Sequence, residues 1–177
     1  RMPQVMKKRF PALTSQEWFE VYQISVINVR QVIDWAKDNP DINEGEIAVI
    51  GGSMGGILSA IAMGVDKRIT AGIFLASGGN WKEITRNRKS RAARMGESYT
   101  EAEYHRIHIW YQRYLHEVAE KGFENVTPIK EWFLTDPLTF ASGLRNRPVL
   151  MINALWDGII PKRCSVDLWE ACGKPPI

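Results

Sequence analysis

Residues 47–64, IAVIGGSMGGILSAIAMG, place a cluster of glycines around Ser53, with an apolar run on either side. The first run is short and rich in β-branched residues, which predicts a buried strand, and the second predicts a buried helix. A chain that passes from strand to helix within a few residues forces the intervening serine into a strained backbone conformation. Side chains two positions away would then collide, so glycine is favoured at Gly51 and Gly55.

This turn has the Gly51-x-Ser53-x-Gly55 spacing of a nucleophile elbow. In such an elbow the serine hydroxyl stands clear at the carboxyl end of a sheet, and the backbone N–H of Met54 points toward any oxyanion formed there. Two other interpretations stay open: a glycine-rich turn that only lets helix and strand pack closely, and a phosphate-binding loop. The segment lacks the lysine and the glycine spacing that phosphate loops use, which disfavours the second.

A serine is a weak nucleophile unless a base takes its proton and an acid orients that base. Asp157 is the candidate acid, because it follows an apolar run at 147–154 that predicts a further strand. The carboxyl ends of parallel strands meet at one edge of a sheet, so Asp157 is expected at the same edge as Ser53. The alternative is an aspartate that only closes an Asx turn.

The alternation of apolar runs predicts an α/β fold, with a parallel sheet and helical crossovers. A first helix begins at a capping box, Thr14 with Glu17, and its expected buried stripe includes Val32. Because the strands show no polar alternation, both faces of the sheet are expected to be covered. Further elements are expected as strands at 46–51, 69–77 and 147–154 and helices at 56–64, 101–122 and 164–174.

The long stretch between the second and third strands divides the chain. The expected units are residues 1–79, a core part with the elbow; 80–140, a helical cap insertion; and 141–177, a core part with the acid-bearing loop. The buried stripe of the insertion's main helix is expected to include Ile107, Trp110 and Tyr114.

Two stretches, DINEGEIAVIGGSMGGILSAIAMGVDKRITAGIFLASGG and FLTDPLTFASGLRNRPVLMINALWDGIIP, resemble the α/β-hydrolase superfamily, and its carboxylesterases and dienelactone-hydrolase-like members most of all. The resemblance implies that Ser53 is the nucleophile, Asp157 the acid of the catalytic triad and Met54 the oxyanion-hole residue. It further implies a serine hydrolase that acts on a small-molecule carboxylic ester, or a related acyl bond, through an acyl-enzyme intermediate. No cofactor and no metal are implied.

The triad histidine follows the acid in this superfamily, whereas His105, His108 and His116 all precede Asp157. The resemblance therefore implies an internal part of a longer hydrolase, without the N-terminal strands, the second oxyanion donor and the C-terminal segment with the histidine. We expect these residues alone to be a poor catalyst or none. Two alternatives stay open: an acyltransferase or perhydrolase on the same scaffold, and a non-catalytic hydrolase-fold binding protein.

Three tryptophans are candidates for a substrate pocket: Trp81 follows the second strand, Trp156 precedes the candidate acid, and Trp110 lies in the insertion. The basic run at 86–94 is expected to be a solvated part of the insertion. On an ideal helix the three histidines share the face opposite the apolar stripe, and His108 and His116 are about 12 Å apart along the axis, too far to share a metal ion.

Composition and charge limit the classes of partner that the chain is expected to bind. A net charge of +3 is too small to imply a nucleic acid, and no run is long enough to span a membrane. Cys164 and Cys172 match no metal-site spacing and are expected to be free thiols of a reducing compartment, which favours the cytoplasm. Three strands make a small sheet with exposed edges, which favours self-association through those edges.

Overall fold

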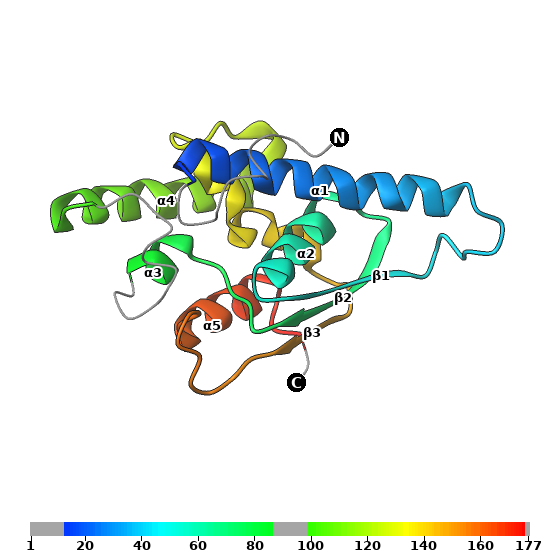
Figure 1. Cartoon of the computed structure of the whole chain (residues 1–177). Coiled ribbons are helices and arrows are strands. Elements are labelled where there is room, and N and C mark those ends of the chain that lie inside the picture. The colour runs from blue at the N-terminus through cyan, green and yellow to red at the C-terminus, as the bar shows by residue number, and fades with distance from the viewer. Residues whose placement is uncertain (1–12, 87–98, 176–177) are drawn as a thin grey trace.

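The computed structural model describes residues 13–86 and 99–175, and its fold is α/β with a parallel sheet (Figure 1). The helices are α1 (Ser15–Lys37), α2 (Met54–Val65), α3 (Trp81–Arg86), α4 (Glu101–Lys121) and α5 (Lys162–Ala171), with 3-10 helices η4 (Phe123–Asn125), η5 (Glu131–Thr135) and η6 (Pro137–Leu144). The strands are β1 (Ile47–Gly52), β2 (Ile69–Leu75) and β3 (Val149–Ile152). The predicted strands and the helices named from the sequence are confirmed, with ends shifted by a few residues.

The capping box that starts α1 is confirmed. The hydroxyl of Thr14 accepts a hydrogen bond from the Glu17 N–H at 3.2 Å, and the Glu17 carboxylate accepts one from the Thr14 N–H at 2.9 Å. The helix then buries Trp18, Tyr22 and other residues of its apolar stripe. The prediction for Val32 is wrong: its side chain is 62% exposed, because the stripe drifts around this long helix and α2 covers only part of it.

The three strands pair in the order β1-β2-β3, and both pairings are parallel. In the register of the sheet, Leu75 of β2 lies opposite Gly52 of β1 and opposite Ile152 of β3. The three strands therefore end level with one another. Everything that follows directly after them lies at one edge of the sheet.

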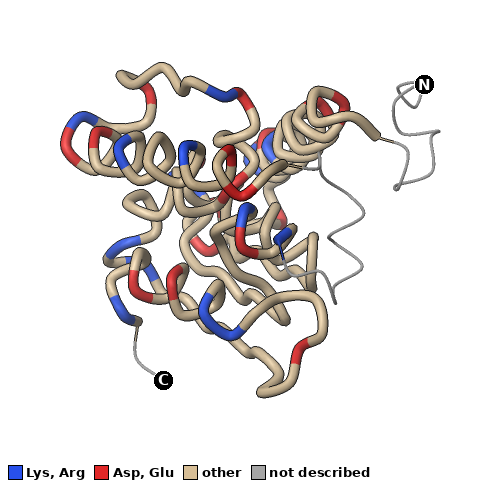
Figure 2. Tube along the Cα trace, turned by 90° about the vertical axis from the view of Figure 1, so that its left-hand side faces the viewer, with Lys and Arg blue, Asp and Glu red and all other residues tan. Residues whose placement is uncertain are grey.

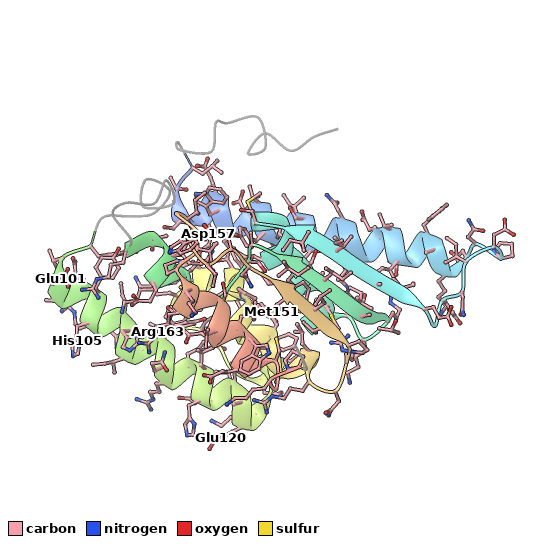
Figure 3. All side chains as sticks on the ribbon, turned by 90° about the horizontal axis from the view of Figure 1, so that it is seen from below. Glu101, His105, Glu120, Met151, Asp157 and Arg163 are labelled. Atoms are coloured by element: carbon pink, nitrogen blue, oxygen red, sulfur yellow. The ribbon has the colours of Figure 1, made fainter. Side chains whose placement is uncertain are left out.

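The expectation that both faces of the sheet are covered is wrong for the described residues. Ile50, Leu150 and Ile152 point to one face and are 66%, 46% and 54% exposed. Right-handed crossovers between strands that follow one another in both chain and sheet put the connecting segments on the same side. On the covered side, opposite the open face, the hydrophobic core packs the sheet against α1, α2, η6 and α5. Its buried residues include Ile33, Met63, Phe74, Leu144 and Leu168. Figure 3 looks onto the open face, with α1 behind the sheet.

The insertion between β2 and β3 lies beyond the carboxyl ends of the strands, where Figure 1 shows α3 and α4. A second capping box, Thr100 with Glu103, starts α4. The helix buries Ile107, Tyr111, Tyr114 and Val118 around Phe133. Trp110 is 37% exposed, so it lies at the margin of the stripe and not in it.

Charges of both signs are interspersed along the described trace (Figure 2). No described helix is long and apolar enough to cross a membrane. Both cysteines are free and buried, and burial raises the pKa of each thiol to about 12.

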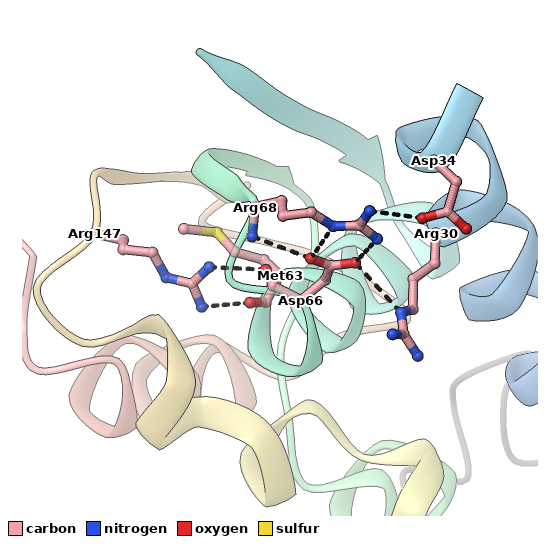
Figure 4. A network of polar contacts seen from close by, with 6 residues as sticks. All are labelled: Arg30, Asp34, Met63, Asp66, Arg68 and Arg147. Atoms are coloured by element: carbon pink, nitrogen blue, oxygen red, sulfur yellow. Dashed lines mark hydrogen bonds and ion pairs between the residues drawn. The ribbon is translucent and has the colours of Figure 1, made fainter. Parts of the chain in front are cut away.

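A polar network ties α1 to the turn between α2 and β2 (Figure 4). The carboxylate of Asp66, 5% exposed, accepts hydrogen bonds from the backbone N–H and the guanidinium of Arg68 and from the guanidinium of Arg30. Arg68 also reaches Asp34 at 2.6 Å. Beside this network the Arg147 guanidinium donates to the carbonyls of Asp66 and Ile69 and to those of Met63 and Gly143.

This network predicts an acid-sensitive contribution to stability. The hydrogen bonds from Arg68 are the main cause that lowers the pKa of Asp66 from 3.8 to about 2. A carboxyl with a depressed folded-state pKa stabilises the fold above its unfolded-state pKa, and that stabilisation is lost as the pH falls through the folded-state value. We expect the free energy of unfolding, measured by urea titration, to lose about 2 kcal/mol from this group between pH 5 and pH 2.

Asp66→Asn supplies the control for that measurement. The variant should be less stable than the parent at pH 7, and its unfolding free energy should fall less steeply with acid. An identical pH dependence in both proteins would contradict the role given to Asp66.

Candidate active site

Ser53 joins β1 to α2 in a backbone conformation that residues with a side chain rarely adopt, with φ 52° and ψ −122°. Its N–H donates to the Leu75 carbonyl at 2.8 Å, and its own carbonyl accepts from the Gly56 and Ile57 N–H groups at 2.9 and 3.2 Å. The sheet and the helix thus hold the strained turn from both sides. The side chain itself is exposed.

The glycines around Ser53 are not equivalent. A Cβ at Gly51 would lie 2.2 Å from the Gly55 carbonyl oxygen and 2.6 Å from the Ser59 hydroxyl oxygen, so a side chain is excluded there. A Cβ at Gly55 would meet nothing within 4 Å, which corrects the expectation that a side chain would collide at that position. The second close approach is at Gly56, where a Cβ would lie 2.8 Å from the Ser77 Cβ. The physical reason is that the start of α2 packs against β1 and β2, whereas a Cβ at Gly55 would point away from both strands.

Met54 is the first residue of α2, directly after Ser53. The first N–H groups of an α-helix have no acceptor within the helix, and the helix dipole makes that end positive. Met54 is therefore placed so that its N–H is a candidate donor to an oxyanion formed at the Ser53 hydroxyl.

Asp157 lies in the loop after β3, beyond the same sheet edge that Ser53 occupies (Figure 3). It is half-buried, and its Oδ1 accepts hydrogen bonds from the N–H groups of Ile159 at 2.7 Å and Ile160 at 3.0 Å. These contacts are those of an Asx turn. They hold the Asp157 carboxylate in place. An aspartate that closes an Asx turn can also orient a base, so the two interpretations of Asp157 are compatible with one another.

Other strained residues gather at this edge. Ala76 follows β2 with φ 45°, and Asn80 precedes α3 with φ 66°. The Ala76 N–H donates to the Ile152 carbonyl at 2.7 Å, and the Ser77 N–H donates to the Asn153 side chain at 2.9 Å. Strained backbone is costly and is often found at functional sites, so the carboxyl edge is the candidate site.

All three histidines lie on α4. His105 and His108 line a cavity bounded by α4 and by Arg163 of α5, and His116 is 74% exposed with an ion-pair distance of 3.4 Å to Glu120. Burial lowers the pKa of His108. The described contacts bring none of them to Ser53.

The tryptophans named from the sequence lie apart. Trp81 is half-buried and lines a cavity of about 70 Å³ together with Trp18 and Trp132. Trp156 is 91% exposed, and neither it nor Trp110 lines that cavity. Of the basic run, Arg86 pairs with Glu101 at 2.8 Å, and residues 87–94 lie outside the described residues.

Asp136 is a residue that sequence reasoning missed. Its carboxylate is fully buried and accepts hydrogen bonds from the N–H groups of Asn80 at 3.0 Å, Trp81 at 2.6 Å and Leu138 at 3.0 Å. Burial raises the pKa of this carboxyl, and these three donors lower it. The Asp-Pro pair at 136–137 is a turn signal that could have drawn attention to it.

Comparison with known proteins assigns the chain to no family. No family model and no curated protein matches the chain. Among residues 13–86 and 99–175, no group of three or more His, Cys, Asp or Glu side chains comes together as a metal site would require.

Proposed function

We propose that Ser53 is the nucleophile of a serine hydrolase of the α/β-hydrolase type, acting on carboxylic esters or related acyl bonds. One observation carries the proposal: the exposed Ser53 sits at φ 52° between a parallel strand and a buried helix, held by hydrogen bonds on both sides. A turn that served only for close packing would not need a serine in a costly conformation with its hydroxyl outward.

The proposed reaction begins when the Ser53 hydroxyl attacks the ester carbonyl and loses its proton to a base. The Met54 N–H donates to the oxyanion of the tetrahedral intermediate. The alcohol leaves with the proton taken up by the base, and water then releases the acid from the acyl-enzyme. Asp157 orients the base.

The described contacts place no general base beside the Ser53 hydroxyl. His116 is directed to Glu120, and His105 and His108 line the cavity between α4 and Arg163. We assign none of them to Ser53, so the proposal leaves the base unassigned. The 177-residue chain alone is therefore expected to hydrolyse esters slowly or not at all.

Hydrolysis of p-nitrophenyl acetate tests this proposal. The product of the whole reading frame should hydrolyse the ester, and Ser53→Ala should lower kcat/KM by about 10³-fold or more. Ser25→Ala is the matched control, because Ser25 lies on α1 with its hydroxyl bonded to the Val21 carbonyl at 2.7 Å. Full activity in Ser53→Ala, or no activity in the parent, would overturn the proposal.

A further inference from the structure

Two adjoining cavities share a wall, one lined mainly by α3 and α4 and the other by α4, η6 and α5. Their volumes are about 400 and 340 Å³, and Asn80, His108 and Arg163 line both of them. Neither wall includes Ser53 or Asp157. Volumes of this size are typical of sites for small molecules.

A buried lysine lines the larger of the two cavities. The side chain of Lys82 is only 6% exposed, and its Nζ lies 3.7 Å from the neighbouring Glu83 carboxylate and 5.9 Å from the centre of the Tyr104 ring. Burial lowers the pKa of the ammonium, and Glu83 works against that shift. A buried ammonium is costly even with an ion pair at 3.7 Å, so an anion beside the Lys82 ammonium would be favoured.

The charged groups that line this larger cavity are Lys82, Arg86 and Arg163 and the carboxylates of Glu83 and Glu101, so basic groups outnumber acidic ones. Arg86 has a close partner, because Glu101 takes its charge at 2.8 Å. Arg163 has a weaker one: its guanidinium is 83% exposed, and Asp167 lies 3.8 Å from its Nε. The positive charges of Lys82, His105 and Arg163 act on His108 in the same direction as burial, lowering its pKa, and only Glu83 opposes them.

The shared wall also holds polar atoms without partners. The Oδ1 of Asn80 and the Nδ1 of His108 are buried and accept or donate no hydrogen bond within the described residues. Asn80 is held at φ 66° by the bond from its N–H to Asp136, and its Nδ2 donates to Asp167 at 3.3 Å. Unsatisfied buried polar groups are rare, and these two both lie on the wall that the cavities share, where an occupant with a polar group could satisfy them.

We propose that these cavities bind a small organic acid, a carboxylate or a phosphate ester, whose acid group lies among Lys82, Arg163 and His108. Figure 3 shows Arg163 on the side of α5 that faces α4, the helix that carries His105. The remainder of the ligand extends into the second cavity along α4 and α5. Ser53 does not line either cavity, so we assign this ligand as an effector or a second substrate and not as the scissile ester.

Titration calorimetry with succinate, and separately with inorganic phosphate, tests the site in the 177-residue protein. At least one probe should bind saturably, and Arg163→Gln and Lys82→Met should each weaken binding by about tenfold or more. The matched control is Arg113→Gln, an arginine of α4 that is 78% exposed and paired with Glu117. It should bind as the parent does.

The two probes separate the two sources of the acid group: binding of succinate alone assigns a carboxylate, and binding of phosphate alone assigns a phosphate ester. Arg163 is exposed, so its variant tests the site even if the buried Lys82→Met fails to fold. No saturable binding by either probe, or equal weakening in Arg113→Gln, would overturn the proposal.

An NMR titration of His108 gives a second readout. A bound anion favours the charged imidazole, so the pKa of His108 should rise on saturation with the probe that binds. Sodium chloride at the same ionic strength should not reproduce that rise. The same shift in chloride would mean general screening, and the proposal would fail.

Discussion

Replacing Gly51 by alanine is expected to destabilise the fold by about 3 kcal/mol or more, at the upper end of what an added methyl group costs in a packed site. The new Cβ would lie 2.2 Å from the Gly55 carbonyl oxygen and 2.6 Å from the Ser59 hydroxyl. The nearest atoms are backbone, which cannot move aside without shifting the start of α2. That shift would also release the strained turn at Ser53. Urea unfolding followed by circular dichroism measures the loss.

Gly55→Ala is the matched control for that substitution. It adds the same methyl group four residues further on, where a Cβ meets nothing within 4 Å and the backbone lies within α2. Alanine in a helix is favoured over glycine, so stability should be unchanged or higher by up to about 1 kcal/mol. Equal destabilisation by the two variants would contradict the packing described at the elbow.

Replacing Asp136 by alanine is expected to cost about 3–5 kcal/mol of unfolding free energy. The carboxylate is fully buried and receives the N–H groups of Asn80, Trp81 and Leu138. Alanine would leave three donors without an acceptor in a region that water does not reach. Because these donors join the start of α3 to the start of η6, the two ends of the insertion should loosen from one another. Thermal unfolding and amide hydrogen exchange at Asn80 and Trp81 measure both effects.

The control for Asp136 is a half-buried residue that makes the same kind of bond in a solvent-exposed place. Asn39 accepts one hydrogen bond, from the Asp41 N–H at 3.0 Å, in the turn after α1. Asn39→Ala should cost less than about 1 kcal/mol. If Asp136→Ala were no more harmful than Asn39→Ala, the anchoring role of the buried carboxylate would be wrong.

The sequence predicts what local rules govern. The capping box at Thr14 and Glu17 starts α1 because those two side chains satisfy the N–H groups of the first turn, which depends on nothing distant. The strand-to-helix turn at Ser53 follows in the same way from a β-branched run, glycines and a buried helix pattern. Its positive φ is the local consequence that the glycine pattern indicates.

Tertiary arrangement decides what the sequence did not show. Ile50 and Leu150 are apolar, so the sequence pattern predicts that both are buried. They lie on an open face because crossovers of the same hand place the connecting segments on the other face of the sheet. Whether a side chain fits at Gly55 depends on how the start of α2 packs against the sheet. Asn80 and Lys82 are far from both Asp136 and Arg163 in the chain, and the four come together because α3, η6 and α5 begin near one another.

The most direct test of the central claim is covalent labelling with a fluorophosphonate probe, located by mass spectrometry of the peptides. Such probes react with serines that an adjacent base has activated. In the product of the whole reading frame, the adduct should fall on Ser53 and form more slowly in Asp157→Asn. An adduct on another residue, or none at all on a folded protein, would contradict the claim that Ser53 is a catalytic nucleophile.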